Sequence, residues 1–233
     1  YSATDGLVSD WHLVHYGSRA TGGVGLIITE MTAISETGRI TEGCAGIYNA
    51  EQLNQWKKIT DFIHNNTETK IGIQLGHSGR KGATKKPWEG NGPLETPWNL
   101  ISASPIPFND NFATPKEMTL EDMAEIKSQF IQAAKNVDEA GFDMIELQVH
   151  HGFLLASFLS PLTNIRSDEF GGSIENRLKY PLEVFNSIRE VFPAEKPISV
   201  RISATDWTEN GISEQEVITI ATAFKNAGAD IIN

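Results

Sequence analysis

The strongest constraint on the fold of this chain is the alternation of short apolar runs with longer amphipathic segments. Five runs are rich in β-branched residues and apolar on both sides, which favours buried strands of a parallel sheet over half-exposed antiparallel strands. These runs are Val24–Glu30, Lys70–Leu75, Asp143–Val149, Ile198–Ser203 and Ala229–Asn233. We also expect the tail of a further strand to end near Tyr1.

Amphipathic helices are predicted between these runs. The segment Glu51–Asn65 repeats apolar side chains at a spacing of three to four residues. Three later segments begin with a Ser or Thr before an acidic first turn, which satisfies free N–H groups and suits the helix dipole. These helices are expected to begin after Thr119, Ser173 and Ser213, and to end near Ala140, Phe192 and Gly228.

Repeated strand–helix–strand units are compatible with two architectures, an open doubly wound sheet and a (β/α)8 barrel. The segment Gly22–Gly25 precedes its strand instead of following it, so the dinucleotide-binding fingerprint is absent. The repeat lengths and a long loop over Trp88–Pro107 suit an elaborated barrel. A complete barrel takes about 250 residues or more. We therefore predict that residues 1–233 form one partial TIM-barrel domain of the α/β class, without the start of strand 1 and the last two strands.

Composition excludes several other classes of protein. The net charge is −11 and no basic stripe is present, which argues against a nucleic-acid partner. No apolar run is long enough to cross a membrane, so a cytoplasmic protein without a membrane partner is expected. The single cysteine, Cys44, excludes a disulfide framework and has no basic neighbour, so we interpret it as structural.

Polar residues gather where four of the predicted strands end. In a barrel, the catalytic residues lie at the carboxyl ends of the strands. An unpaired buried polar group costs about 1–3 kcal/mol. Four polar clusters at one end of the barrel therefore indicate a functional site more than polar core residues that are hydrogen-bonded internally. The clusters are Glu30–Thr32, Gln74–Lys81, Gln148–Phe153 and Arg201–Ser203. Adjacent strand residues point to opposite faces, so the pair His150 and His151 predicts no metal site.

Two long motifs resemble those of the Old Yellow Enzyme family of FMN oxidoreductases. The segment Ile71–Lys81 is similar to the family's third strand and flavin-binding loop, and Phe158–Arg177 resembles its most specific signature. From the residues alone, the charged part of that segment is expected to be a structural loop, stabilised by Arg–Asp pairs and followed by a helix capped at Ser173. The resemblance covers essentially the whole chain and points to the NADPH-dehydrogenase-like branch. The stretches Arg39–Cys44 and Leu100–Ser104 incline toward the reductase-like domain of salicylyl-CoA and 2-aminobenzoyl-CoA hydroxylases.

The resemblance implies an enzyme that holds FMN at the barrel mouth and passes hydride from NAD(P)H to a small-molecule acceptor. That acceptor would be an α,β-unsaturated carbonyl compound or an aryl- or enoyl-CoA thioester. By the same resemblance, Gln74 would bond the flavin pyrimidine edge, Arg201 would lie near N1 and O2, and Met31 would pack beside the ring. A homo-oligomer is also expected.

The resemblance assigns the acceptor side to Tyr1, Gln148 and His151 as catalytic residues, with His150 and Phe153 as further substrate contacts. Two of these depart from the family pattern, which usually has histidine in place of Gln148 and tyrosine in place of Phe153. Gln148 donates through its amide but is no acid, and Phe153 has no hydroxyl. His150 replaces a small residue. The final proton would then come from water, Tyr1 or His150.

These departures leave several alternatives open. The protein could be a working reductase with an altered acceptor, or a degenerate barrel that binds flavin and has little ene-reductase activity. It could also be the reductase-like domain of a bifunctional aryl-CoA hydroxylase, or a relative with an iron–sulfur cluster. The loops that hold the FMN phosphate are expected beyond Asn233. Residues 1–233 alone are therefore expected to bind FMN poorly.

Overall fold

A computed structural model describes residues 1–233 and shows a six-stranded parallel sheet with the strand order β2-β1-β3-β6-β7-β8. Its strands are β1 (Leu26–Ala33), β2 (Ala45–Gly46), β3 (Lys70–Gly76), β6 (Met144–Val149), β7 (Ile198–Ile202) and β8 (Ile231–Ile232). A separate two-stranded sheet pairs β4 (Ile101–Ser102) with β5 (Lys116–Glu117). The helices are α1 (Asp10–Thr21), α2 (Ala50–Asn66), α3 (Leu120–Glu139), α4 (Leu154–Leu159), α5 (Ile174–Val191) and α6 (Glu214–Ala227), with 3₁₀ turns η1 (Gly79–Lys81) and η2 (Pro87–Glu89).

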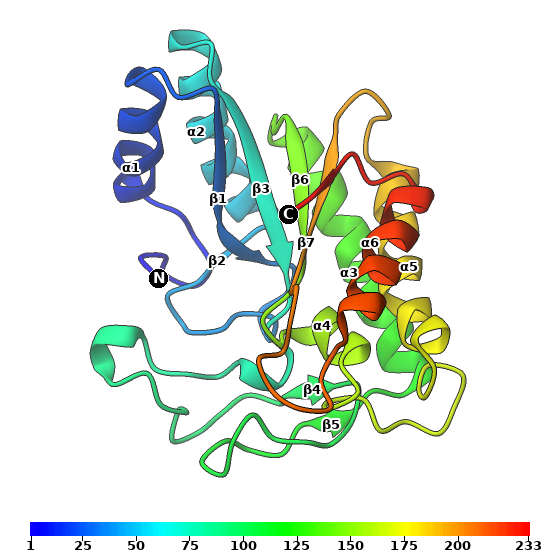
Figure 1. Ribbon diagram of the computed structural model, residues 1–233. Coiled ribbons are helices and arrows are strands. Elements are labelled where there is room, and N and C mark those ends of the chain that lie inside the picture. Colours follow the sequence, from blue (N-terminus) through cyan, green and yellow to red (C-terminus); the bar gives the residue numbers. More distant parts are fainter.

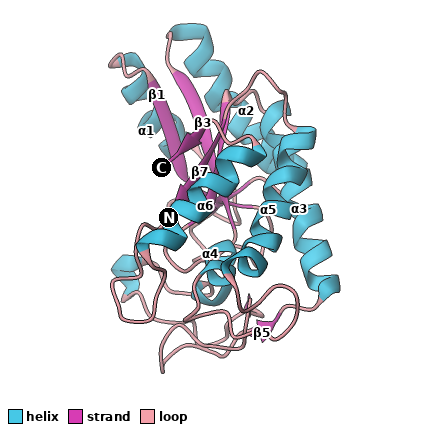
Figure 2. Ribbon diagram, turned by 45° about the vertical axis from the view of Figure 1, so that its right-hand side comes forward, coloured by secondary structure: helices cyan, strands magenta, loops and turns pink.

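The helices pack around the outer side of the main sheet, as in a (β/α)8 barrel (Figures 1 and 2). Strands β1, β3, β6, β7 and β8 follow one another in chain order across the sheet, and each is joined to the next by a crossover segment. The carboxyl ends of the strands, the short sheet β4–β5 and the long connecting loops lie together at one end (Figure 1). The predicted α/β barrel architecture is therefore confirmed.

The predicted helix starts agree with the structure. The hydroxyl of Thr119 accepts the N–H of Asp122 at 3.1 Å at the start of α3. Ser213 caps α6 in the same way, by accepting the N–H of Glu216 at 3.3 Å. Ser173 caps α5. These caps satisfy N–H groups that have no partner within the helix, which is why the sequence signal was specific.

The first long strand differs from the prediction. Strand β1 ends at Ala33, three residues later than expected, and its pairing with β3 shifts between Ile28 and Met31. Its side chains alternate between buried and exposed over the first four residues, with Ile28 37% exposed, because no further layer covers that part of its surface. The expected strand tail near Tyr1 is not formed, and residues 1–8 contain only an isolated bridge between Thr4 and Leu7.

Helix α1 was not predicted because its buried side is not conventionally apolar. The residues that it buries are His12, Tyr16, Gly17 and Ala20. A Cβ atom at Gly17 would lie 2.9 Å from the ring of Phe62, so the absence of a side chain lets α2 approach α1. The helix is thus stabilised by close packing that a search for Leu, Ile and Val at helical spacing does not detect.

The largest side chains of the hydrophobic core are aromatic. The largest fully buried ones are Trp56, Phe130, Phe142, Phe158, Tyr180, Phe185 and Phe224.

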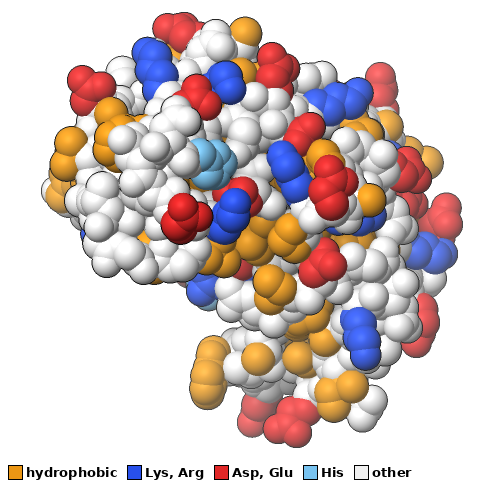
Figure 3. Space-filling view, turned by 90° about the horizontal axis from the view of Figure 1, so that it is seen from above, with side chains coloured by type: hydrophobic (Ala, Val, Ile, Leu, Met, Phe, Trp, Pro, Cys, Tyr) orange, Lys and Arg blue, Asp and Glu red, His pale blue; other side chains and the backbone are white.

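No helix combines the length and apolarity that a bilayer crossing requires. On the face seen from above, Lys and Arg are interspersed with Asp and Glu and form no basic stripe (Figure 3).

Candidate active site

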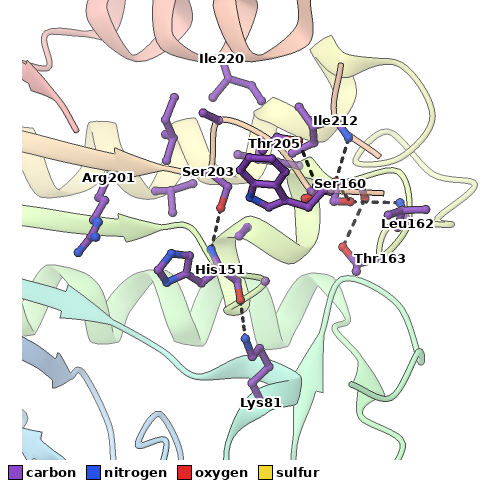
Figure 4. Close-up of a pocket in the computed structure, with 18 of the residues that line it drawn as sticks. Lys81, His151, Ser160, Leu162, Thr163, Arg201, Ser203, Thr205, Ile212 and Ile220 are labelled. Atoms are coloured by element: carbon purple, nitrogen blue, oxygen red, sulfur yellow. Dashed lines mark hydrogen bonds between the residues drawn. The ribbon is translucent and has the colours of Figure 1, made fainter. Parts of the chain in front are cut away.

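A cavity of about 570 Å³ opens among the loops that follow β3, β6 and β7 (Figure 4). Its lining combines the cations Lys81 and Arg201, the imidazole of His151 and apolar side chains that include Phe108 and Trp207. Each of these polar groups comes from the carboxyl end of a strand or the loop after it. The cavity therefore lies where a barrel carries its chemistry.

Strand register places several predicted residues side by side. Met31 of β1 pairs with Gln74 of β3, and Gln74 pairs with Glu146 of β6. Two residues further along β6, Gln148 pairs with Arg201 of β7. Since residues two apart on a strand point to the same face, Glu146 and Gln148 present their side chains on one side of the sheet.

The side chain of Glu146 is the centre of the hydrogen bonds among these neighbouring strands. Glu146 is 1% exposed and accepts hydrogen bonds from Gln74 Nε2 at 2.8 Å, Asn233 Nδ2 at 2.9 Å and Ser199 Oγ at 3.3 Å. The amide nitrogen of Gln74 is thus the end of the side chain that faces Glu146. The amide oxygen of Gln74 then faces Gln148, whose Nε2 donates to it at 3.3 Å.

Glu146 was missed by the sequence analysis, although a signal was present. It stands two residues before Gln148 in an otherwise apolar strand, and the period of two places both on the same face. The hydrogen-bond chain also restricts the amide of Gln148 more than the sequence indicated. One N–H of this amide donates to Gln74, and its Oε1 is buried without a hydrogen-bond partner.

His151 reaches the cavity and Gln148 does not. The imidazole of His151 is exposed and lines the cavity, whereas Gln148 is 2% exposed and is not a lining residue. His150 is 4% exposed, and both of its ring nitrogens are without hydrogen-bond partners. Its ring meets that of His151 edge to face at 4.2 Å, and the ring of Phe153 lies 6.1 Å away.

Positive charge dominates the electrostatics of the cavity. Burial, together with the charges of Arg201 and Lys81, lowers the pKa of His151 below its usual value. Burial and the neighbouring His151, Arg201 and Lys81 lower the pKa of His150 to about 3. Both imidazoles are therefore neutral at pH 7. Each then has one N–H donor and one acceptor nitrogen.

Of the predicted residues, only Arg201 and His151 line this cavity, and two others line a different one. Tyr1 and Met31 line a second cavity of about 370 Å³, which has no lining residue in common with the first. Burial, Cys44 and Glu30 raise the pKa of the Tyr1 hydroxyl, so it keeps its proton. Met31 is still joined to the row through its register with Gln74.

The charged signature loop has the structural role predicted for it. Arg166 Nε donates to both carboxylate oxygens of Asp168, at 3.0 and 3.1 Å, and its Nη1 donates to the carbonyls of Ala103 and Met118. Cys44 is buried, and burial raises the pKa of its thiol. Neither feature contributes a group to the cavity.

The chain is similar to flavin oxidoreductases in sequence and in structure. The family model described as "NADH:flavin oxidoreductase / NADH oxidase family" matches residues 1–233. An NADH:flavin oxidoreductase from Gibberella zeae is 44% identical over 216 residues, which is 90% of this chain and 52% of that protein. An NADPH dehydrogenase from Listeria monocytogenes is 40% identical over 229 residues, 98% of this chain and 63% of that protein.

Solved structures give the same result for the fold. A complex of 2-naphthoyl-CoA reductase with 2-naphthoyl-CoA matches with a TM-score of 0.87 and 27% identity, over 97% of this chain and 35% of that one. Morphinone reductase matches with a TM-score of 0.82 and 29% identity, over 99% of this chain and 64% of that one. The chain thus spans a little over half to under two thirds of the length of these curated relatives. Because the family match extends from Tyr1 to Asn233, this chain belongs to the NADH:flavin oxidoreductase / NADH oxidase family, as its resemblance to the Old Yellow Enzymes predicted.

Proposed function

We propose that the complete protein is an FMN-dependent oxidoreductase that passes hydride from NAD(P)H to an α,β-unsaturated carbonyl compound or a CoA thioester. The observation that carries the proposal is the guanidinium of Arg201, which lines the cavity and has no hydrogen bond or ion pair within the chain. An unpaired cation beside the neutral amides of Gln74 and Gln148 suits a ring that becomes anionic when it is reduced.

Other groups of the site fit the same ring. Buried polar atoms without partners, Gln148 Oε1 and both ring nitrogens of His150, are available to the polar edge of a ligand. FMN, when bound, supplies the chemistry of accepting a hydride from NAD(P)H and delivering it to an acceptor. Gln74 would hold the pyrimidine edge, Arg201 would stabilise negative charge on it, and Met31 would pack beside the ring system.

His151 is the residue that we propose for holding the acceptor. Its ring makes no hydrogen bond within the chain, it faces the cavity, and its lowered pKa keeps one neutral N–H available. A hydrogen bond from this N–H to a carbonyl oxygen would polarise the acceptor and make its β-carbon electrophilic. Gln148 would act indirectly, through its hydrogen bond to Gln74. Water would supply the proton that Phe153 cannot, because Tyr1 lines the other cavity and His150 is buried and neutral.

The class of acceptor is narrowed by the apolar part of the cavity. Phe108 and Trp207 form a rim suited to a flat aromatic or alicyclic compound, with Trp207 92% exposed. Similarity to 2-naphthoyl-CoA reductase supports an aryl-CoA thioester, and similarity to morphinone reductase supports a ring ketone.

A second candidate is a barrel that binds flavin and is reduced by NAD(P)H without productive transfer to an enone. It is favoured by Gln148, whose buried amide donates to Gln74 and does not line the cavity, and by the missing hydroxyl at Phe153.

The visible spectrum of the complete protein, recorded anaerobically, tests both candidates. A flavin band that bleaches with NADH or NADPH and returns with 2-cyclohexenone or an aryl-CoA is expected for the reductase. A band that bleaches and does not return with any of these acceptors would favour the second candidate. A protein that shows no flavin band after reconstitution with FMN would refute both.

A further inference from the structure

The backbone of His151 adopts a conformation that most side chains avoid. Its φ is +56°, that of Gly152 is +71°, and the N–H of Phe153 donates to the carbonyl of His150 at 3.2 Å. Two successive positive φ values under such a bond are typical of a type I′ turn. The left-handed region costs a residue with a side chain about 1 kcal/mol, so contacts are needed to hold His151 in it.

Side chains from two neighbouring loops hold both peptide groups of His151 (Figure 4). The hydroxyl of Ser203, just after β7, accepts the N–H of His151 at 2.9 Å. The ammonium of Lys81, at the end of η1, donates to the carbonyl of His151 at 2.7 Å. If either peptide group turned over, one of these bonds would break and the imidazole would leave its present direction.

Lys81 is itself held in place. Its ammonium lies 4.6 Å from the centre of the Phe108 ring and 4.9 Å from that of Phe153, both within the range of a cation–π contact. A flexible lysine would be a poor support, since its side chain has many rotamers. Fixed between two rings, it supports the turn as a rigid group.

We propose that Lys81 and Ser203 are positioning residues that fix the direction of the His151 imidazole in the cavity. The proposal rests on the proposed function only in assuming that His151 holds the carbonyl oxygen of the acceptor. It assigns the two residues a role through the backbone of the turn, without contact between them and the reacting atoms.

Four variants of the complete protein separate this role from the charge of the lysine. Lys81→Met removes both the charge and the hydrogen bond, whereas Lys81→Gln retains an N–H donor without the charge. Ser203→Ala removes the other bond and changes no charge. Lys85→Met, in the same loop but with a 40% exposed side chain, is the matched control.

The first readout is reoxidation of the dithionite-reduced protein by 2-cyclohexenone, compared with reoxidation by oxygen. Misplacement of a reacting group by about 1 Å can cost roughly 100-fold in rate, so we expect Lys81→Met and Ser203→Ala to slow reoxidation by cyclohexenone roughly 10- to 100-fold. Reoxidation by oxygen, which needs no carbonyl contact, should stay within about twofold. Lys81→Gln should recover most of the rate, and Lys85→Met should match the wild type.

The second readout is the NMR spectrum of the labelled imidazole of His151, which needs no turnover. Its signals should move or broaden in Lys81→Met and Ser203→Ala, and return in Lys81→Gln. If Lys81→Met or Ser203→Ala behaves like the wild type in both readouts, the positioning role is wrong. A wild-type protein that is not reoxidised by any carbonyl acceptor would refute the proposed function instead, and the imidazole signals would still decide the positioning role.

Discussion

At the scale of single residues, the site combines buried groups whose hydrogen bonds are already committed with cavity groups that remain free. Glu146 orients the amide of Gln74, which in turn orients Gln148. Arg201 and the imidazole of His151 have no partner within the chain. A ligand in the cavity would therefore meet a cation and an imidazole whose hydrogen-bonding groups are unpaired, which favours electrostatic stabilisation of a developing negative charge.

Phe153 gives the first prediction at this scale. Phe153→Tyr restores a hydroxyl beside the cavity, on a ring that already packs against the Lys81 ammonium at 4.9 Å. If a proton donor limits turnover, the complete protein should reduce 2-cyclohexenone about tenfold or more faster, because positioned acid catalysis contributes roughly 10²–10⁴-fold. Steady-state kinetics under anaerobic conditions measures this. An unchanged kcat would show that the missing hydroxyl is not the limiting factor.

His77 gives a prediction for stability against pH. Its ring is fully buried, its Nδ1 accepts the N–H of Gly79 at 3.0 Å, and burial lowers its pKa to about 3. The unfolded chain takes up a proton near pH 6.5, so it binds more protons than the folded state between pH 6.5 and about 3. This contribution to stability is therefore complete above pH 6.5 and is lost as the pH falls toward 3.

The measurement compares urea unfolding of the wild type with that of His77→Asn at pH 7.5 and 5.5. Asparagine retains an acceptor near the position of Nδ1 and does not titrate. The wild type should lose about 1 kcal/mol more than the variant over this interval, because one pKa unit corresponds to about 1.4 kcal/mol. Equal losses in the two proteins would contradict the buried neutral state of His77.

At the scale of elements, polar side chains in the loops hold the barrel mouth together. Asn164 donates to the carbonyls of Phe158 and Phe170 at 2.7 and 2.8 Å, which closes the loop between α4 and α5 on itself. Arg166 joins this loop to the short sheet β4–β5 through the carbonyls of Ala103 and Met118. The residues that form the wall of the cavity thus depend on hydrogen bonds outside it.

Arg166→Met tests this connection. The substitution leaves the carbonyls of Ala103 and Met118, which belong to buried residues, without their donor. An unsatisfied buried group costs about 1–3 kcal/mol, so we expect a loss of about 2–4 kcal/mol in the free energy of unfolding of the complete protein. Lys179→Met, which removes a surface pair with Glu169, should change it by about 0.5 kcal/mol or less. Similar losses in both variants would refute the role of Arg166.

At the scale of the whole molecule, the six strands form one sheet in which β1 and β8 leave apolar side chains exposed. Leu26 and Ile28 of β1, and Ile231 and Ile232 of β8, are between 37% and 43% exposed. The groups proposed to hold FMN lie on β1, β3 and β7, and Asn233, directly after β8, also lines the cavity.

FMN affinity gives the prediction at this scale. Residues 1–233 produced alone should bind FMN roughly 100-fold more weakly than the complete protein, a difference of about 3 kcal/mol, because phosphate contacts would be missing. Titration of flavin fluorescence measures both dissociation constants. Equal affinities would show that this chain holds the whole cofactor by itself.

The sequence by itself determined the parallel α/β architecture, the starts of α3, α5 and α6, and the strand ends that carry polar groups. These features depend on local periodicity, on capping residues and on a barrel's directional strands, all of which are readable along the chain. The sequence did not reveal α1, because that helix is stabilised by the approach of Phe62 to Gly17.

Only the tertiary structure decided how the site residues are arranged. Cross-strand register joins Glu146, Gln74 and Gln148 into one hydrogen-bond chain and buries Gln148, whereas His151 lines the cavity. The hydrogen bonds of Lys81 and Ser203 with the backbone of His151 join residues that are 70 and 52 positions apart in the sequence. Contacts over such separations depend on how the strands are staggered in the sheet, and no local pattern in the sequence specifies that stagger.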